Sequence, residues 1–260
     1  MKEKLEEIVR KYNYSPKYQV DVMGKKVDVP VKYSDASALM VFFSISLKKA
    51  KSLLDSERLT PVSILGGRCL LGITFFDYRD CPAGPYHEFT FSIPVLVDSK
   101  FHIPLLPIIL DSFFKNFGYY VFLMGADSDI SRLHIEKIFP YPVVNKNLHI
   151  NLEESDDLLI ASIKDAEVEV ISITHDLPHS YTLEKKGYNT YYKKDGRIYD
   201  VKLQTFSYYA KIFGRTKNSY IHMGDHQISN NLKELGISSK PLVSVYYKRA
   251  VEVAEGPTGV

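Results

Sequence analysis

Tryptophan is absent from this sequence of 260 residues, cysteine occurs only twice, and neither sign of charge dominates. The 33 lysine and arginine residues nearly balance the 31 aspartate and glutamate residues, which leaves a formal net charge of +2. Nucleic-acid-binding domains gather basic residues on one surface, and no run of lysine or arginine does so here. We therefore expect no nucleic-acid partner.

Metal-ligand patterns are also scarce. Cys69 and Cys81 do not have the spacing of a metal site, so they fit reduced thiols in a cytoplasmic protein; a disulfide between them is the alternative. Two histidine pairs with a spacing of four residues, at 175/179 and 222/226, are interrupted by a proline and a glycine. Neither pair is therefore expected to lie on one helix face as metal ligands, and we predict neither a metal nor a cofactor.

Long apolar runs are missing as well. Residues 104–110 form one of the longest, whereas a helix needs about 20 apolar residues to cross a bilayer. Residues 1–7 have no apolar core and do not have the pattern of a signal peptide. These features predict a soluble, cytoplasmic protein without a membrane partner.

Apolar periodicity and turn residues indicate many strands and a few short helices. Helices are expected at 2–12, 47–54, 104–116 and 229–235. Strands are expected at 38–45, 68–76, 89–95, 119–124, 147–152, 158–164, 167–173, 188–192, 198–206 and 242–253, with a hairpin at 20–31. No linker or repeat interrupts the chain, so we predict a single α+β domain over residues 1–260 that consists mainly of antiparallel strands.

The most informative segment is residues 80–88, DCPAGPYHE, a turn rich in proline and glycine that leads into an alternating strand. Side chains on a strand alternate between its two faces, so Glu88, Thr90 and Ser92 should share one face and an apolar set the other. A carboxylate at the head of such a polar stripe is suited to face a cavity. A solvated sheet face is the alternative.

The order of a strand, a helix and a strand that runs into residues 77–88 resembles the acetoacetate decarboxylase superfamily. The Gly-Pro-Tyr-x-Glu motif at 84–88 carries the resemblance, and residues 214–251 continue it toward the C-terminus. The resemblance implies a cone-shaped, closed antiparallel β-barrel with a few short helices, on which residues 1–35 pack as a helix and a hairpin. It also implies a small-molecule ligand, a carboxylate or an apolar compound, and a homo-oligomer.

Decarboxylases of this superfamily use a lysine that forms a Schiff base with a β-keto acid. Residues 131–142 match the segment that holds it, with Phe139 and Pro140 at the aromatic-proline pair. Tyr141 then occupies the position of the lysine, and a phenol cannot form an imine. The second acid of the decarboxylases also has no counterpart on residues 71–75. Of the catalytic residues that the resemblance implies, only Glu88 is retained.

We therefore predict Glu88 and Tyr141 as catalytic residues, and Tyr86, Phe139 and Lys137 as substrate-binding residues. Lys137 is two strand periods before Tyr141, so in a regular strand the two side chains would face the same way. A solvated lysine is the alternative at this position.

Three functions follow. The first is a lyase or related enzyme that acts on a small oxo-carboxylate, with Glu88 as general acid and base and Tyr141 as hydrogen-bond donor to the carbonyl oxygen. The second is a barrel that binds a small molecule without catalysis. The third is a true decarboxylase with a relocated lysine such as Lys137.

Overall fold

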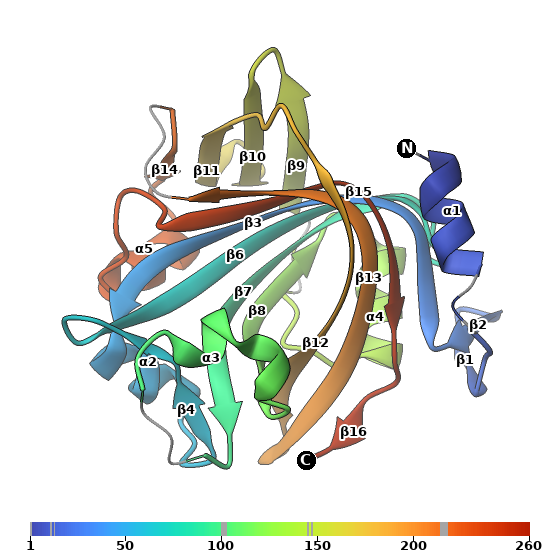
Figure 1. The fold of residues 1–260 in the computed structure, drawn as a ribbon, viewed down its shortest axis with the longest axis horizontal. Helices are drawn as coiled ribbons and strands as arrows, with labels where there is room; N and C mark the ends of the chain where they lie inside the picture. The colour runs from blue at the N-terminus through green and yellow to red at the C-terminus, as the bar shows by residue number, and fades with distance from the viewer. Residues whose placement is uncertain are drawn as a thin grey trace.

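The computed structural model describes residues 2–10, 12, 14–99, 103–144, 146, 148–213 and 218–260. Seven strands close into a barrel (Figure 1), in the order β7-β8-β12-β13-β15-β3-β6, with β6 paired again to β7. Their bounds are β3 Val31–Ser46, β6 Arg68–Asp80, β7 Tyr86–Val97, β8 Phe117–Ala126, β12 Thr182–Lys194, β13 Arg197–Phe213 and β15 Val243–Ala254. The predicted closed, mainly antiparallel barrel is confirmed.

Tight turns of the expected chemistry connect neighbouring strands. Asp195 and Gly196 join β12 to β13 with φ angles of 50° and 74°. Two consecutive residues with positive φ make the type of turn whose twist matches an antiparallel hairpin, and Asp-Gly is a favoured pair for it. The predicted turn is therefore confirmed, although both strands are longer than expected.

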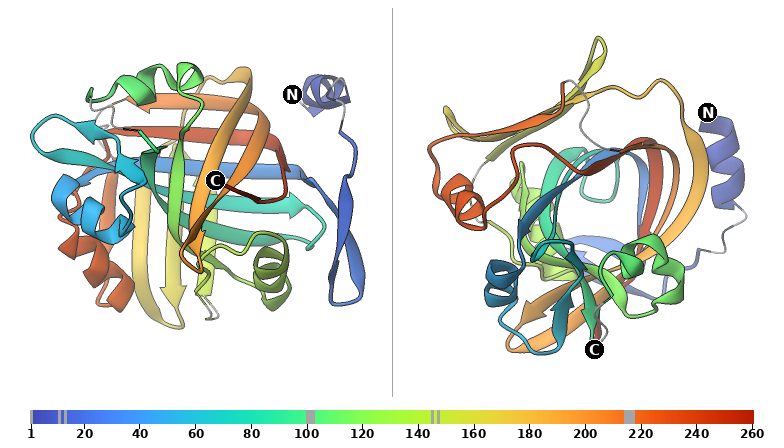
Figure 2. Two further views of the ribbon diagram at one scale, coloured as in Figure 1. Left: turned by 90° about the horizontal axis from the view of Figure 1, so that it is seen from below. Right: turned by 60° about the vertical axis from the view of Figure 1, so that its left-hand side comes forward.

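A four-stranded sheet covers the outside of the barrel wall (Figure 2). Its order is β14-β11-β10-β9, with bounds β9 Leu148–Ser155, β10 Leu158–Asp165, β11 Val168–Asp176 and β14 Tyr220–Met223. Phe89, Phe91 and Ile93 of β7 are fully buried in the apolar cluster that includes Ile163 and Ile173 of this sheet. The main apolar core therefore lies outside the barrel, which leaves the polar stripe of β7 free to face inward.

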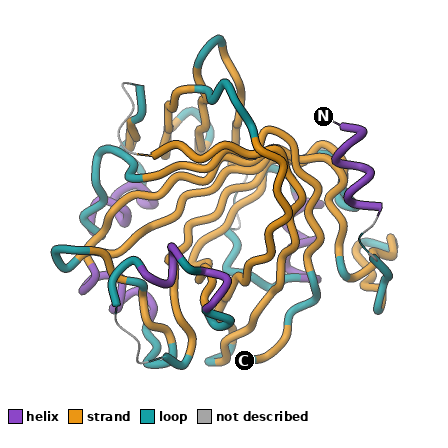
Figure 3. The backbone as a smooth tube through the Cα atoms, viewed as in Figure 1, coloured by secondary structure: helices purple, strands orange, loops and turns teal. Residues whose placement is uncertain are grey.

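Helices occupy the periphery, as the tube in Figure 3 shows. They are α1 Lys2–Arg10, α2 Leu47–Leu54, α3 Leu106–Ile109, α4 Asp129–Ile138 and α5 Gln227–Glu234, with the 3-10 turn η1 Asp111–Phe113. The predicted cap of α2 is present, because the Ser46 side chain accepts a hydrogen bond from the Lys49 amide over 3.4 Å. Gly236, with a φ of 70°, ends α5 as predicted.

Short strands complete the fold. The hairpin of β1 Tyr18–Val22 and β2 Lys25–Val29 packs its valines in one apolar cluster with α4, and α1 packs on β13 and β15 through Leu5. The remaining strands are β4 Leu59–Pro61, β5 Ser63–Ile64 and β16 Thr258–Gly259. None of the described helices is long and apolar enough to cross a membrane.

One expected element is wrong, and the geometry considered at one candidate residue does not apply. The helix predicted over 104–116 is reduced to α3 and η1, because Leu105 takes a left-handed φ of 64° directly before α3 and the chain leaves helical geometry again at Leu110. The strand geometry assumed between Lys137 and Tyr141 is replaced by the end of helix α4. Residues 214–216, which belong to the C-terminal resemblance, lie outside the described residues.

Both cysteines are free, so the alternative of a disulfide is not realised. Cys69 is fully buried in the apolar cluster outside the barrel. The Cys81 thiol donates to the Gly84 carbonyl oxygen over 2.9 Å within the turn before β7. Each cysteine therefore has a local packing or turn-forming role.

The barrel closes through one short parallel pairing, between β8 and β12, which is limited to Gly118–Asn189, Tyr119–Thr190 and Tyr120–Tyr191. A Cβ atom on Gly118 would lie 2.4 Å from the carbonyl oxygen of Asn189. A backbone atom cannot swing away as a side chain can, so the close approach of the two strands requires glycine at this position.

We expect Gly118→Ala to lower the free energy of unfolding by about 1–3 kcal/mol, the usual cost of overpacking. Urea denaturation followed by circular dichroism measures it. Gly187→Ala on β12 is the matched control, since its Cβ would be 3.4 Å from the end of the Gln204 side chain and 3.7 Å from a carbonyl oxygen. Equal stability of the two variants would contradict the steric account of the pairing.

Candidate active site

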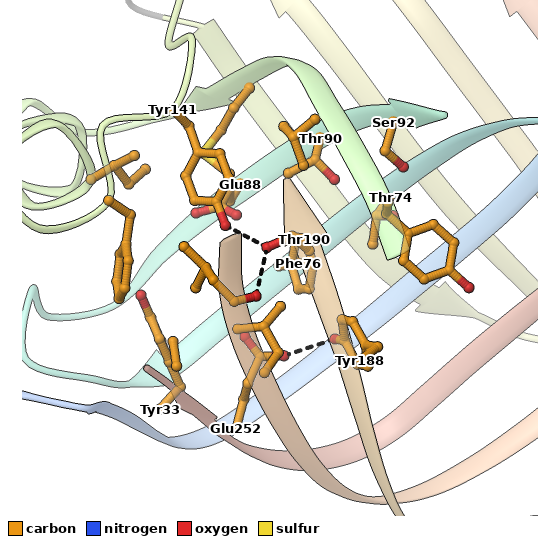
Figure 4. A pocket seen from close by; sticks show the side chains of 18 of the residues that line it. Tyr33, Thr74, Phe76, Glu88, Thr90, Ser92, Tyr141, Tyr188, Thr190 and Glu252 are labelled. Atoms are coloured by element: carbon orange, nitrogen blue, oxygen red, sulfur yellow. Dashed lines mark hydrogen bonds between the residues drawn. The ribbon is translucent and has the colours of Figure 1, made fainter. Parts of the chain in front are cut away.

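A cavity of about 70 Å³ lies inside the barrel (Figure 4). Inward-facing side chains of all seven barrel strands, together with α4 and the residues after it, form its wall. The polar groups of this wall are Tyr33, Thr74, Tyr78, Glu88, Thr90, Ser92, Tyr119, Tyr141, Tyr188, Thr190 and Glu252. The cavity therefore combines two carboxyl groups with a lining of tyrosine and threonine hydroxyls.

Glu88 projects into the cavity from the start of strand β7, and Thr90 and Ser92 follow it on the same face. The alternation expected from the sequence is confirmed. The side chain is 5 % exposed, and the Tyr86 hydroxyl donates to its Oε2 over 3.1 Å. Burial raises the pKa of the Glu88 carboxyl to about 8; the Tyr86 hydrogen bond opposes this shift, and the charge of Glu252 adds to it.

A second acid, Glu252 of β15, faces the same cavity and was not predicted. Its Oε2 accepts hydrogen bonds from the Tyr188 hydroxyl over 3.2 Å and from Thr205 over 3.3 Å. Burial raises the pKa of the Glu252 carboxyl to about 7, while these two hydrogen bonds lower it. The cavity therefore contains two carboxyl groups whose neutral forms are favoured near neutral pH.

A β-bulge explains why the sequence did not reveal Glu252. Val243, Val245 and Tyr247 face the barrel interior, so strict alternation would turn residue 252 outward. The register of β15 against β3 shifts between Tyr247 and Ala250, which brings Glu252 inside. The one signal in the sequence is a glutamate in the otherwise apolar run 250–254.

No positive side chain compensates the two acids. The residues that line the cavity, all within the described ranges, include no lysine, arginine or histidine. His134 of α4 is fully buried beside Tyr33, with ring centroids 6.4 Å apart, and burial lowers the pKa of His134 to about 4. The imidazole is therefore neutral and adds no charge to this side of the cavity.

Tyr141 lines the same cavity as Glu88, on the segment that follows α4. The Met124 amide donates to the Pro142 carbonyl oxygen over 3.0 Å and the Val144 amide to that of Met124 over 2.8 Å, so this segment is held along β8. The Tyr141 hydroxyl is 2.5 Å from that of Thr190. Burial raises the pKa of the Tyr141 phenol, which therefore stays protonated and able to donate.

The other predicted site residues differ in their placement. Phe139 lines the cavity, whereas Tyr86 does not line it and contacts Glu88 through its hydrogen bond to that carboxyl. Lys137 is exposed on α4 and does not line the cavity. A helix turns by about 100° per residue, so the strand argument that placed Lys137 and Tyr141 on one face does not apply.

The described residues contain no group of three or more histidine, cysteine, aspartate or glutamate side chains placed to hold a metal ion. His222 instead pairs with Glu169, and His226 lies 3.3 Å from an Asp165 carboxylate oxygen. His175 is buried, with its Nδ1 3.0 Å from the Asp176 carbonyl oxygen.

Comparison with known proteins identifies the fold. No family model and no curated protein matches this sequence. One solved acetoacetate decarboxylase structure is 14% identical, with 89% of each chain covered and a TM-score of 0.62. The acetoacetate decarboxylase of Legionella pneumophila is also 14% identical, over 97% of this chain and 94% of its own, with a TM-score of 0.61.

A third match is the enduracididine biosynthesis enzyme MppR complexed with pyruvate, 9% identical over 90% of this chain and 91% of its own, with a TM-score of 0.54. At these identities the likeness shows the fold alone, and the fold is that of acetoacetate decarboxylase. The fold expected from the resemblance is therefore confirmed.

The two acids should make stability depend on pH. The folded chain retains a proton on Glu88 up to a pH of about 8, whereas the ordinary pKa of the carboxyl is 4.5. Between these values the native state binds more protons than the unfolded state, so the free energy of unfolding should fall as pH rises. Glu88→Gln and Glu252→Gln should each make this fall shallower. At pH 8.5 each should have a free energy of unfolding higher than that of the parent by on the order of a few kcal/mol.

Urea denaturation at pH 5, 6.5 and 8.5 measures how the free energy of unfolding changes with pH. Glu153→Gln serves as control, since Glu153 is exposed on β9 outside the barrel. The same pH slope in the parent and in both buried-acid variants would contradict the assignment of raised pKa values.

Proposed function

We propose that this chain, which has the acetoacetate decarboxylase fold, is a lyase or related enzyme that acts on a small oxo compound by acid-base catalysis without a Schiff base. The observation that carries the proposal is the convergence of the Glu88 carboxyl and the Tyr141 hydroxyl on one buried cavity that contains no amine. A general base works best when its pKa lies near the working pH, and a value of about 8 for Glu88 meets this condition.

In the proposed reaction the substrate presents its carbonyl oxygen to Tyr141 and an α-hydrogen to Glu88. Ionised Glu88 takes the α-proton, the electrons of the broken C–H bond form a carbon–carbon double bond, and the π electrons of the carbonyl move to its oxygen. The Tyr141 hydroxyl donates a hydrogen bond to the resulting enolate oxygen. Glu88 then returns its proton to the α-carbon; alternatively the enolate re-forms the carbonyl, the bond from the β-carbon to a leaving group breaks, and Glu88 protonates that leaving group.

Thr190 supports this role of Tyr141. The two hydroxyls share one hydrogen bond in which either can donate, and Thr190 also lies 3.3 Å from the Val201 carbonyl oxygen. When a carbonyl oxygen binds, Thr190 donates to Tyr141, and the Tyr141 proton turns toward the substrate. A relay of this kind keeps both hydroxyls satisfied in the free and the bound states.

The two acids of the cavity limit the class of substrate that it can bind. An anionic oxo-carboxylate would approach Glu88 and Glu252 without a lysine or arginine to receive it, and a buried charge without a partner is costly. The proposed substrate is therefore an uncharged ketone or aldehyde, or an oxo acid that binds with its carboxyl protonated. The same lack of a lining lysine weighs against decarboxylation through Lys137.

A non-catalytic binding barrel is the second candidate. The small cavity volume of about 70 Å³ among tyrosine and phenylalanine rings favours it. The two candidates differ in one measurable respect. An enzyme would exchange the α-hydrogens of its substrate with solvent, whereas a binding barrel would leave those of its ligand in place.

The test is solvent exchange, which requires no knowledge of the full reaction. Propanone, butan-2-one, pyruvate and acetoacetate are incubated with the protein in D₂O, and proton NMR follows the loss of α-hydrogens. We expect catalysed exchange of the uncharged ketones, with a rate that rises toward pH 8 as Glu88 ionises. Glu88→Gln should lower kcat/KM by about 10²–10⁴-fold, and Tyr141→Phe by about 10²-fold.

Glu153→Gln again serves as control and should exchange at the parental rate. Exchange that persists unchanged in both Glu88→Gln and Tyr141→Phe would contradict the proposed roles. Ligand binding without exchange, seen by native mass spectrometry, would favour the binding barrel instead.

A further inference from the structure

A second chamber of about 420 Å³ lies in the same barrel, on the side where α3 covers its opening. Its wall is mainly apolar and includes Phe42, Leu70, Pro94, Ile108, Val243 and Val245. Its charged lining residues balance in sign: Lys186 and Asp111 form an ion pair at 2.6 Å, and Glu184 and Lys211 add one charge of each sign. The chamber therefore suits an uncharged, apolar group.

The two chambers share part of their walls. Met40, Tyr119 and Tyr188 line both the inner cavity and this outer chamber. The rings of Tyr119 and Tyr188 meet edge to face with centroids 6.1 Å apart, and Tyr188 donates to Glu252. Tyr188, which lies between the chambers, is thus hydrogen-bonded directly to the inner acid Glu252.

Gly72 of β6 lies at the boundary between the chambers. A Cβ atom at this position would lie 2.9 Å from Ser92 Oγ, which lines the inner cavity, and 3.1 Å from Phe42 Cε1, which lines the outer chamber. The missing side chain lets Ser92 and Phe42 pack closely against the backbone of β6 at this point. The two chambers therefore lie next to each other along the barrel interior.

We propose that the outer chamber holds the hydrocarbon tail of the substrate, an alkyl or aryl chain attached to the oxo group that lies between Glu88 and Tyr141. This inference rests on the proposed function and specifies its substrate class. The occupant follows from this shared wall, because a chain attached to a head group in the small inner cavity reaches the outer chamber past Met40 and Tyr119. Ile109 of α3 lines the chamber and is 69 % exposed, which gives an apolar tail contact with the opening.

A series of methyl ketones from butan-2-one to nonan-2-one tests the inference. The kcat/KM for deuterium exchange should rise roughly threefold to fourfold with each added methylene until the chamber is filled. Val245→Trp, which places an indole in the chamber, should remove this rise and leave exchange of butan-2-one unchanged. Ile108→Trp on the covering segment is a second blocking variant that does not alter the barrel wall.

Ile130→Trp is the matched control, because Ile130 is exposed on α4 and does not line the chamber; it should retain the full dependence on chain length. If butan-2-one exchanges but longer ketones gain nothing, the inference is wrong and the proposed function stands. If no ketone exchanges, the binding of the same ketones, measured by tyrosine fluorescence, tests the apolar chamber separately from the proposed function. Affinity that rises with chain length and is lost in both blocking variants supports the chamber alone, and affinity independent of chain length overturns it.

Discussion

The burial of Glu88 and Glu252 in one cavity without a cation is the interaction on which the site depends. Removing a carboxylate from water is unfavourable unless a positive group or several hydrogen-bond donors replace the solvent. Within the described part of the chain, tyrosine and threonine hydroxyls are the donors to the two acids, so protonation relieves part of the cost of burying them. The same feature that weakens the fold at high pH supplies a carboxyl able to exchange a proton near neutrality.

The fold tolerates this arrangement because its main apolar core lies elsewhere. The outer face of β7 packs against the four-stranded sheet through fully buried phenylalanines, while the inner face carries the polar stripe. One strand thus contributes to stability on one side and to the site on the other. The short parallel pairing of β8 with β12 also has two roles. It closes the barrel, and it positions Thr190 beside Tyr141.

Local patterns in the sequence were sufficient for much of this structure. The alternation from Glu88 to Ser92, the Asp195-Gly196 turn and the cap at Ser46 depend on neighbouring residues only, and each is present. The motif at 84–88 also led to the correct fold. Glu252 could not be predicted because the bulge that turns it inward is set by pairing with a distant strand.

Helix α4 was missed for a related reason. Its N-cap Ser128 is visible in the sequence, but the spacing of Lys137 and Tyr141 was considered only in strand geometry. Arg132 donates to the carbonyl oxygens of Ala126 and Lys146, contacts that hold α4 at the end of β8 and place Lys137 toward solvent. The site therefore arises from long-range contacts around a motif that is local.

The most direct measurement is a titration of the glutamate side-chain carboxyl carbons by ¹³C NMR, with Glu88→Gln and Glu252→Gln used for assignment. The account predicts two glutamates that titrate as an interacting pair with apparent pKa values of about 7 and about 8, well above the other glutamates. Ordinary titration of every glutamate near pH 4–5 would contradict it, since the cavity acids would then be solvated or paired with a cation.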